Sequence, residues 1–355
     1  MKARILVLGD RFCPASVMRT AFARFEADHE VDYADVTDEP GWVPVTASDH
    51  RIREYMGTPR QVIKRLGGHQ VLVMQGAAIT EEVLDADPDL RLICCARGGP
   101  VNVDVAAATA RGIPVVTTPG KNADSVAELT IAFMIMLARR LPEVIRHVEG
   151  GGEFAHDNYE GARWFGHDLA GKVLGLVGYG QVGRRVATRA LAFGMRVQVS
   201  DPYVEAASIL ADGAEPTDLS SLLGTSDFVS LHARATSRLI GPGEVARMKV
   251  GAFLVNTARD SLVDEEAVLA GLRSGQLAGL AVDLVSPSPA TGRHPLLGHP
   301  NVIITTHIGG ATYETVERAG EMAAAEIGRF LRGEPLVNVA DRAALGSSGT
   351  PAPNR

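Results

Sequence analysis

The sequence predicts an α/β fold with two parallel β-sheets, and three observations support this prediction. Short apolar runs of strand length alternate with helix-length segments along nearly the whole chain, a pattern typical of parallel βαβ units. The chain has 38 glycines among 355 residues, well above the usual share of about 7%, which suits many tight turns between strands and helices. At roughly 150 residues per domain, this length predicts about two domains.

The first series of alternating elements covers residues 1–121. Thr80, followed by two glutamates, is expected to cap a short helix, because acidic side chains are favourable in a first helical turn. Cys94 and Cys95 are adjacent in one predicted strand, so they should face opposite sides of the sheet as small buried residues. The expected strands are Arg4–Gly9, Val31–Val36, Val71–Gln75, Leu90–Ala96 and Pro114–Thr117, and the expected helices are Ala15–Ala27, Arg51–Leu66, Glu81–Ala86 and Val103–Arg111.

A long helix, expected from Ala123 to Val148, follows the first series. Ser125 and Glu128 have the spacing of a capping box, which marks a helix N-terminus. The apolar positions of this segment are so dense that more than one face of the helix must be buried. We therefore expect the helix to bridge two domains or to pack against a partner subunit.

A second series of strands and helices follows, and its last helix, Ala311–Leu331, leads away from it. The tail from Ala343 is rich in Ser, Gly and Pro and is predicted to be disordered. The expected strands are Lys172–Val177, Arg196–Ser200, Phe228–His232, Ala252–Thr257, Ala278–Leu284 and Val302–Thr306, and the expected helices are Val182–Phe193, Asp218–Leu223, Gly243–Met248 and Asp264–Arg273.

The composition argues against several classes of partner. The net charge is −7 and the pI is near 5.8, and neither value indicates the basic face that nucleic-acid binding requires. The longest apolar stretch, Ile131–Ala138, is far shorter than the roughly 20 residues that cross a bilayer, so no membrane association is expected. Three cysteines form no disulfide framework, and no metal site is predicted. We expect reduced thiols and a cytoplasmic protein.

The motif Gly-Tyr-Gly-Gln-Val-Gly begins at Gly178, between an apolar strand and a predicted helix. Gly178 allows a tight turn, Gly180 lets the backbone approach a pyrophosphate, and Gly183 permits close packing of the helix on the strand. Asp201 ends the next strand, 18 residues after Gly183, where an acidic residue can accept hydrogen bonds from the ribose hydroxyls of an adenosine. No Arg or Lys occurs in the next three residues to receive a 2′-phosphate, so the motif predicts NAD rather than NADP.

Arg259 and His307 each come shortly after a predicted strand of the second series. Because ligands of open parallel sheets bind beyond the carboxyl ends of the strands, both residues should lie on the edge where the cofactor binds. Reduction of a 2-keto acid needs a guanidinium that holds the carboxylate and polarises the carbonyl, and a group titrating near neutrality that supplies the hydroxyl proton. Alone, Arg259 would be interpreted as a surface ion-pair former and His307 as a core residue. Together with the glycine motif, the two predict catalysis.

The chain resembles the D-isomer-specific 2-hydroxyacid dehydrogenase family from about Val71 to Val339. The resemblance rests on ordered motifs, which include Val103-Asp104, Asn122 with Ser125–Leu129, Gly178–Gly183, Ser230–His232, Asn256–Arg259, Leu262–Ala267, Ala281–Asp283 and His307–Thr312. It implies two Rossmann-like parallel-sheet domains: a flavodoxin-like substrate-binding domain, residues 1–121 completed by 312–342, and an inserted NAD-binding domain, residues 122–311. It also implies a small 2-hydroxy or 2-keto acid as substrate, and homodimers formed through the NAD-binding domain.

Carried over by position, the resemblance implies roles for individual residues. Arg259 would bind the substrate carboxylate and carbonyl, and His307 would donate the proton while hydride passes from NADH to the carbonyl carbon. Arg97 would either contact an acidic or polyhydroxylated substrate or form a salt bridge across the cleft. The residues implied at the substrate are Gly98 and Gly99, through backbone amides, and Asn122; those implied at the cofactor are Gly178, Gly180, Gln181, Val182, Gly183, Asp201, His232, Thr257 and Asp283. Selectivity for the substrate side chain is expected in the loops Arg11–Ser16, Met74–Ile79 and Arg97–Val101.

The sequence departs from the family pattern at three places. The family usually has a Glu 29 residues after the Arg, where it pairs with the His, and here that position is Ser288. Ser288 brings no charge to stabilise a protonated imidazole, so we expect 2-keto acid reduction to have its optimum on the acid side. Asp260 replaces the Gly after the Arg. Met74-Gln75-Gly76 stands where phosphoglycerate-specific members carry arginines, which argues against 3-phosphoglycerate.

Two other functions stay open at the level of the sequence. One is an NAD-sensing interaction protein with little or no turnover, resembling the corepressor branch of the family. The missing Glu favours this function, and the retained Arg259 and His307 oppose it. The other is a formate dehydrogenase, which needs no proton transfer, although such enzymes characteristically have Gln at the position of Ser288.

Overall fold

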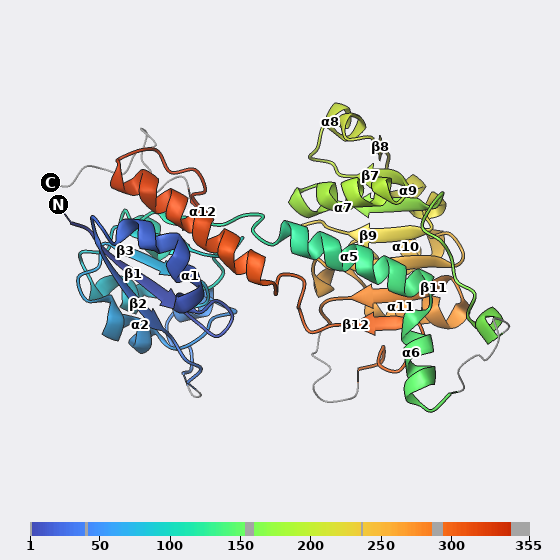
Figure 1. The fold of residues 1–355 in the computed structure, drawn as a ribbon, viewed down its shortest axis with the longest axis horizontal. Helices are drawn as coiled ribbons and strands as arrows, with labels where there is room; N and C mark the ends of the chain where they lie inside the picture. Colours follow the sequence, from blue (N-terminus) through green and yellow to red (C-terminus); the bar gives the residue numbers. More distant parts are fainter. Residues whose placement is uncertain (1, 40–41, 153–159, 236, 286–293, 342–355) are drawn as a thin grey trace. The chain divides into compact units, whose positions relative to one another are not determined.

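The computed structural model describes the chain except residues 1, 40–41, 153–159, 236, 286–293 and 342–355. Ser288 and the predicted disordered tail, 343–355, lie outside the described residues. The chain forms two compact units (Figure 1): unit 1 combines Met1–Lys121 with Thr312–Arg355, and unit 2 is Asn122–Ala311. Each unit is built on one parallel sheet with helices, which confirms the predicted α/β fold class.

The sheet of unit 1 has five parallel strands. They are β1 (Arg4–Gly9), β2 (Glu30–Asp35), β3 (Val71–Met74), β4 (Leu92–Cys95) and β5 (Val115–Thr117), in the spatial order β2-β1-β3-β4-β5. Val7 of β1 pairs with Tyr33 on one side and with Val73 on the other. The strand order therefore reverses between β1 and β3, and ligands of open α/β sheets bind beyond the carboxyl ends of the strands at such a reversal.

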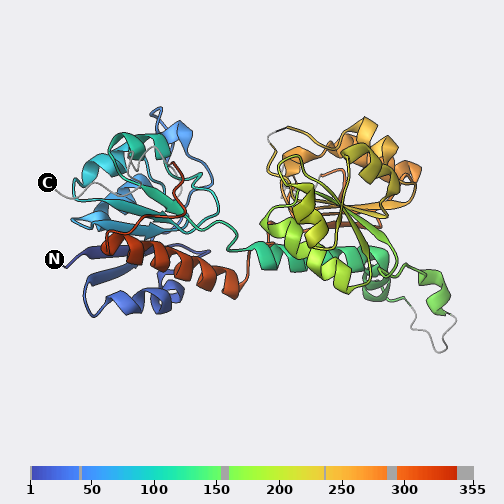
Figure 2. The same ribbon diagram turned by 90° about the horizontal axis from the view of Figure 1, so that it is seen from above.

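Two hydrophobic clusters cover the two faces of this sheet. The helical elements are α1 (Ala15–Phe22), η1 (Ala23–Phe25), η2 (Asp49–Arg51), α2 (Pro59–Leu66), α3 (Glu81–Ala86), α4 (Val105–Ala110) and α12 (Tyr313–Leu331). α12 returns from the C-terminal part of the chain and packs against α1 (Figure 2). Cys94 belongs to the cluster on the α1 and α12 face and Cys95 to the opposite cluster, which confirms that the two thiols face opposite sides.

The sheet of unit 2 has seven parallel strands. They are β6 (Val173–Val177), β7 (Arg196–Ser200), β8 (Glu215–Pro216), β9 (Phe228–Leu231), β10 (Ala252–Asn256), β11 (Leu277–Val282) and β12 (Val302–Ile304), in the spatial order β12-β11-β10-β9-β6-β7-β8. All pairs are parallel, so the carboxyl ends of these strands share one edge of the sheet. The order reverses between β6 and β9, next to the glycine motif.

Helices again cover both faces of the unit 2 sheet. They are α5 (Ala123–Ala138), α6 (Leu141–Glu149), η3 (Glu160–Trp164), α7 (Gln181–Ala192), α8 (Ala206–Ala211), α9 (Leu219–Thr225), α10 (Pro242–Arg247), η4 (Asp260–Leu262) and α11 (Glu265–Ser274). α5 and α7 lie side by side on one face, where Phe133, Met134 and Leu137 pack into the core (Figure 1). Within the described part of the chain, no helix is both long and apolar enough to cross a membrane.

The predicted single helix Ala123–Val148 is wrong, because the chain divides it into α5 and α6. Arg140, between them, adopts a left-handed conformation with φ of 54°. Its guanidinium donates hydrogen bonds of 3.0 and 2.7 Å to the carboxylate of Glu143, which holds this turn. Pro142 lies in the first turn of α6, where the missing amide hydrogen removes no helical bond. The apolar pattern runs through the break and therefore does not reveal it.

Three other local predictions need correction. The predicted helix Arg51–Leu66 is only α2, because Gly57 has φ of 70° and the Thr58 side chain caps a helix that starts at Pro59. The predicted capping box at Ser125 is also wrong, since α5 already begins at Ala123. Thr80 does stand at the N-cap of α3, but its side chain accepts no capping bond; the hydroxyl of Ser48 accepts the Glu81 amide instead, at 2.9 Å.

Candidate active site

The glycine motif forms the turn between β6 and α7. Gly178 has φ of 97°, and a Cβ atom there would lie 2.6 Å from a backbone nitrogen of the segment after β9. A Cβ atom at Gly183 would lie 2.4 Å from the carbonyl oxygen of Gly178. At Gly180, no described atom lies within 4 Å of a Cβ position, so the backbone there is open to a ligand. Because the first-turn amides of α7, which starts at Gln181 and Val182, have no partner in the helix, the turn fits a pyrophosphate.

Asp201 lies against this turn, directly after β7. Its carboxylate accepts hydrogen bonds from the amides of Tyr179, at 2.6 Å, and Tyr203, at 2.8 Å. Each carboxylate oxygen has a second lone pair, so the same side chain can also accept hydrogen bonds from ribose hydroxyls. The two backbone bonds fix the carboxylate beside the turn that fits the pyrophosphate.

His232 follows β9, and its amide donates a 2.8 Å hydrogen bond to the carbonyl oxygen of Val177 in β6. The ring atom Nε2 lies 2.9 Å from the hydroxyl of Ser230. Burial lowers the pKa of His232 to about 4, because removal from water disfavours the charged form. The ring is therefore neutral near pH 7 and adds no positive charge to this edge of the sheet.

Asn256 holds the turn that carries Arg259. Asn256 ends β10 and is 3% exposed; its Nδ2 atom donates to the carbonyl oxygen of Arg259, at 2.7 Å, and its Oδ1 atom accepts the Ala258 amide, at 3.0 Å. The guanidinium of Arg259 donates a 2.7 Å hydrogen bond to the Ala258 carbonyl oxygen and is otherwise exposed. The buried amide thus fixes the backbone and leaves most guanidinium donors free for a carboxylate.

Asp283 holds the turn that carries His307. The Asp283 carbonyl oxygen accepts the His307 amide at 2.7 Å. The Asp283 carboxylate accepts the amides of Ile308, at 2.9 Å, and Gly309, at 2.7 Å, and the hydroxyl of Thr305, at 2.6 Å. His307 has φ of 62° and is exposed. Left-handed backbone costs a non-glycine residue about 1–2 kcal/mol, and the hydrogen bonds to Asp283 offset that cost.

Asn122 and Thr257 link α5 to these turns. A Cβ atom at Gly310 would lie 3.0 Å from the Nδ2 atom of Asn122, so Asn122 packs against the turn of His307. The hydroxyl of Thr257 lies 2.9 Å from that of Thr130 in α5. α5 therefore supports both turns from one face of the sheet.

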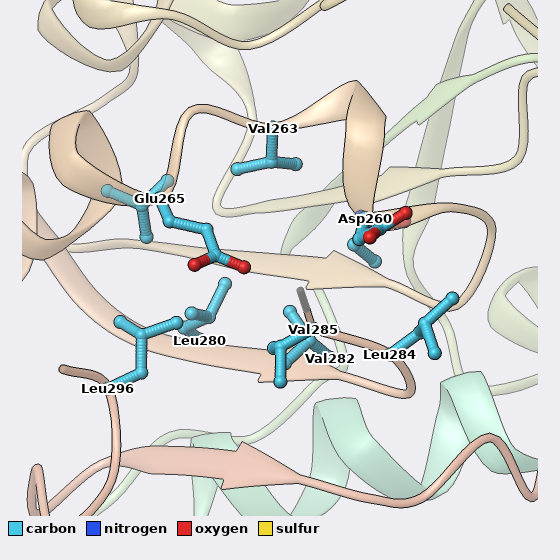
Figure 3. A pocket seen from close by; sticks show the side chains of 10 residues that line it. Asp260, Val263, Glu265, Leu280, Val282, Leu284, Val285 and Leu296 are labelled. Carbon is cyan, nitrogen blue, oxygen red and sulfur yellow. The ribbon is translucent and has the colours of Figure 1, made fainter. Parts of the chain in front are cut away.

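Asp260, which stands in place of the family Gly, lines a small pocket (Figure 3). Its Oδ1 atom accepts the amide of Ser261 at 2.8 Å, and it forms no ion pair with Arg259 in the described structure. The carboxylate of Glu265 points toward apolar side chains that include Leu280, Val282 and Val285. The cavity is about 10 Å³, room for about one water molecule. It is too small for a substrate, and Asp260 is the first residue of η4.

In unit 1, the loop after β4 carries Arg97, Gly98 and Gly99. The Arg97 guanidinium pairs with the Glu54 carboxylate and also donates to the Glu54 carbonyl oxygen at 2.8 Å. Both residues belong to unit 1, so this pair is not the salt bridge across the cleft that was one of the two alternatives for Arg97. Neither the Gly98 nor the Gly99 amide donates a hydrogen bond to any described residue. These two successive amides are therefore available to an acceptor from outside the described residues.

The predicted site residues gather at two sheet edges, one in each unit. The residues at the carboxyl edge of unit 2 are Gly178, Gly180, Gln181, Val182, Gly183, Asp201, His232, Thr257, Arg259, Asp283 and His307. Arg97, Gly98 and Gly99 follow β4 at the carboxyl edge of unit 1. Sequence reasoning missed Asn256 as the support of Arg259, although a polar residue that ends an apolar strand was a visible signal. The described residues contain no cluster of three or more His, Cys, Asp or Glu that could hold a metal ion.

Comparison with known proteins agrees with this arrangement. The family described as D-isomer specific 2-hydroxyacid dehydrogenase, NAD binding domain, matches residues 131–309. This range lies within unit 2 and includes the glycine turn and the turns of Arg259 and His307.

Similar proteins extend over most of the chain. D-3-phosphoglycerate dehydrogenase of Methanocaldococcus jannaschii is 36% identical over 287 residues, 79% of this chain and 53% of its own length. Glyoxylate reductase of Korarchaeum cryptofilum is 37% identical over 268 residues, 74% of this chain and 80% of its own. The crystal structure of TT0316 protein from Thermus thermophilus superimposes with a TM-score of 0.75 at 34% identity, covering 95% of this chain and all of that one.

The fold and the glycine turn thus define a protein with a dinucleotide-binding domain. The chain belongs to the D-isomer specific 2-hydroxyacid dehydrogenase family, and unit 2 contains the NAD-binding domain of that family. The chain spans about half the length of the phosphoglycerate dehydrogenases that it matches.

Proposed function

We propose that this protein is an NAD-dependent oxidoreductase that interconverts a D-2-hydroxy acid and its 2-keto acid. One observation carries the proposal: Asn256 and Asp283, at the ends of the neighbouring strands β10 and β11, hold the turns that bear Arg259 and His307. A guanidinium and an imidazole are thereby presented at the sheet edge where the glycine turn lies. The matched relatives named dehydrogenase and reductase support this proposal.

Arg259 and His307 have complementary roles in this reaction. Arg259 binds the substrate carboxylate through two parallel hydrogen bonds and stabilises the negative charge that develops on the carbonyl oxygen, typically worth a few kcal/mol. His307 holds the proton that the carbonyl oxygen receives in reduction and accepts it back in oxidation. NADH, when bound, supplies the reducing equivalent. Ser288 replaces the usual Glu partner of the His, so in our proposal His307 acts without that carboxylate.

Unit 1 is the substrate-binding domain in this proposal, formed by residues 1–121 and completed by 312–342. The free amides of Gly98 and Gly99 bind the substrate carboxylate. Arg97 keeps Glu54 in place beside them, and Asn122 acts on the His307 turn from the start of α5.

The cofactor is NAD rather than NADP. The Asp201 carboxylate is held beside the glycine turn by the amides of Tyr179 and Tyr203. A ribose 2′-phosphate next to it would meet like charge, whereas a 2′-hydroxyl can donate to it.

Unit 2 is the dimerisation domain. No residue of α6 is buried. Ile145 in α6 is 47% exposed, and Phe165, which follows η3, is 80% exposed. Apolar surface of this kind is typical of an interface between protein subunits. In our proposal, a second copy of this chain packs against this surface, as the family resemblance implies.

The NAD-sensing alternative finds no support in the matched relatives, whose names are those of enzymes. A panel of 2-keto acids, each assayed with NADH and with NADPH, tests the proposed function. We expect oxidation of NADH with at least one acid, and loss of that activity in Arg259→Met and His307→Gln. Tight NADH binding without turnover of any acid would instead favour the sensor.

A further inference from the structure

Lys121 is a buried lysine without an anionic partner. It is 7% exposed, and in the described structure its ammonium group makes no hydrogen bond and has no carboxylate within 4.0 Å. Burial lowers the pKa of Lys121, since the charged form is removed from water. An unpaired buried cation is unfavourable for folding. Proteins retain unfavourable groups such as an unpaired buried cation at functional sites, where a bound ligand supplies the missing partner.

The Lys121 side chain reaches the point where the strand order of unit 1 reverses. Lys121 follows β5 at one side of the sheet, whereas its Nζ atom lies 5.9 Å from the ring centre of Phe12, in the loop after β1. Asp10 and Arg97, at the ends of β1 and β4, are the nearby charged side chains that act on it. The ammonium therefore lies over the carboxyl ends of the central strands, where open α/β sheets bind ligands.

The neighbouring charged groups already have partners. The Asp10 carboxylate accepts the amides of Phe12 and Cys13, each at 2.9 Å, and of Gly76, at 2.7 Å. Arg97 pairs with Glu54. Asp10 is thus directed at the backbone and lies beyond ion-pair distance of Lys121, so the ammonium has up to three donors for an incoming acceptor.

We propose that Lys121 binds a second anionic group of the substrate, a carboxylate or a phosphate, in addition to the carboxylate next to the reacting carbon. This inference rests on the proposed function, in which unit 1 binds the substrate and the amides of Gly98 and Gly99 bind its first carboxylate. The ammonium lies near Phe12 and Arg97, which belong to two of the loops where selectivity for the substrate side chain is expected. The substrates are then 2-hydroxy acids with a further acidic group.

Matched pairs of substrates test this inference. 2-Oxoglutarate and 2-oxopentanoate have the same chain length and differ only in the terminal carboxylate, and 3-phosphohydroxypyruvate and 3-hydroxypyruvate differ only in the phosphate. In the wild type, we expect kcat/KM to be at least ~10-fold higher for the member of one pair that has the second anionic group. A charge-assisted hydrogen bond to Lys121 would supply a preference of this size. The pair that shows the preference identifies the anionic group. Lys121→Met should lower that ratio by a similar factor, and Lys121→Arg should restore part of it.

Lys64→Met, which removes an exposed lysine from α2, is the matched control and should keep the wild-type ratio. A purely structural role of Lys121 would reduce kcat/KM for both members of a pair and leave the ratio unchanged, and this result would overturn the inference. If no 2-keto acid is turned over, the proposed function fails, and binding is then measured by thermal melting with glutarate and pentanoate. A larger shift with glutarate that Lys121→Met abolishes supports the anion site, and equal shifts contradict it.

Discussion

The backbone amide of His307 donates a 2.7 Å hydrogen bond to the carbonyl oxygen of Asp283. The carboxylate of the same aspartate accepts the next two amides of the chain, so one residue at the end of β11 fixes the whole turn. Asn256 fixes the turn of Arg259 in a similar way from the end of β10. The positions of the two proposed catalytic residues therefore depend on buried polar side chains that need not touch the substrate.

Asp283→Asn should impair activity more than stability. An amide in place of the carboxylate has one acceptor atom, so at least one of the amides of Ile308 and Gly309 loses its partner, at a cost of about 1–3 kcal/mol. If this free energy is lost from the transition state, kcat/KM should fall by roughly 10- to 100-fold. Asp227→Asn is the control, because Asp227 also accepts a backbone amide, from Val173, but lies at the start of its strand. If both variants keep wild-type kcat/KM, Asp283 does not position His307.

Asn256→Ala should release the turn of Arg259. The variant loses one donor and one acceptor from a residue that is 3% exposed, and we expect a loss of about 1–3 kcal/mol in stability. It should also raise KM for the keto acid, because Arg259 binds the carboxylate. Asn301→Ala removes a comparable 2.7 Å bond to the carbonyl of Ala278 and should lower stability without changing KM. Equal effects of the two variants on KM would refute the positioning role.

The sequence predicts the fold class and the glycine turn better than it predicts how the turns of Arg259 and His307 are supported. The glycine motif can be interpreted from the sequence because its geometry is local. At Gly178 and Gly183, a Cβ atom would clash with neighbouring backbone atoms, so only glycine fits. The break at Arg140 could not be predicted, because it depends on a left-handed residue and its bonds to Glu143 rather than on apolar periodicity. Lys121 was missed for a related reason: a lysine is expected to be exposed, and its burial depends on loops that are distant in sequence.

His232 should make stability depend on pH below neutrality. Its pKa falls from 6.5 to about 4 in the folded protein, so the unfolded chain binds the proton more readily between these values. Stability from this group is therefore fully present above pH 6.5 and decreases as the pH falls toward 4, by up to ~3 kcal/mol. Urea unfolding from pH 4.5 to 7.5 should show a smaller loss for His232→Asn, which cannot be protonated. Parallel curves for the wild type and the variant would contradict this expectation.

Phe165→Asp should weaken self-association. The side chain is 80% exposed, and a carboxylate on an apolar subunit interface must lose its water without gaining a partner. Sedimentation velocity should show a dimer for the wild type and a shift toward monomer for the variant. Val250→Asp is the control, because Val250 is similarly exposed, at 76%, but lies between α10 and β10 rather than in the segment that follows α6. A wild-type monomer, or equal effects of both variants, would refute the proposed dimer.

The pH dependence of kcat/KM in both directions, measured for the wild type and for His307→Gln, tests the central claim most directly. Reduction consumes the proton that His307 holds and oxidation returns one to it, so the wild-type rates in the two directions should depend on pH in opposite senses. In His307→Gln, both rates should be at least ~100-fold lower and should lose the pH dependence that the His307 proton causes. NADH binding should stay close to that of the wild type. A variant that keeps the wild-type rates and pH profile would show that His307 is not the acid/base and would contradict the account.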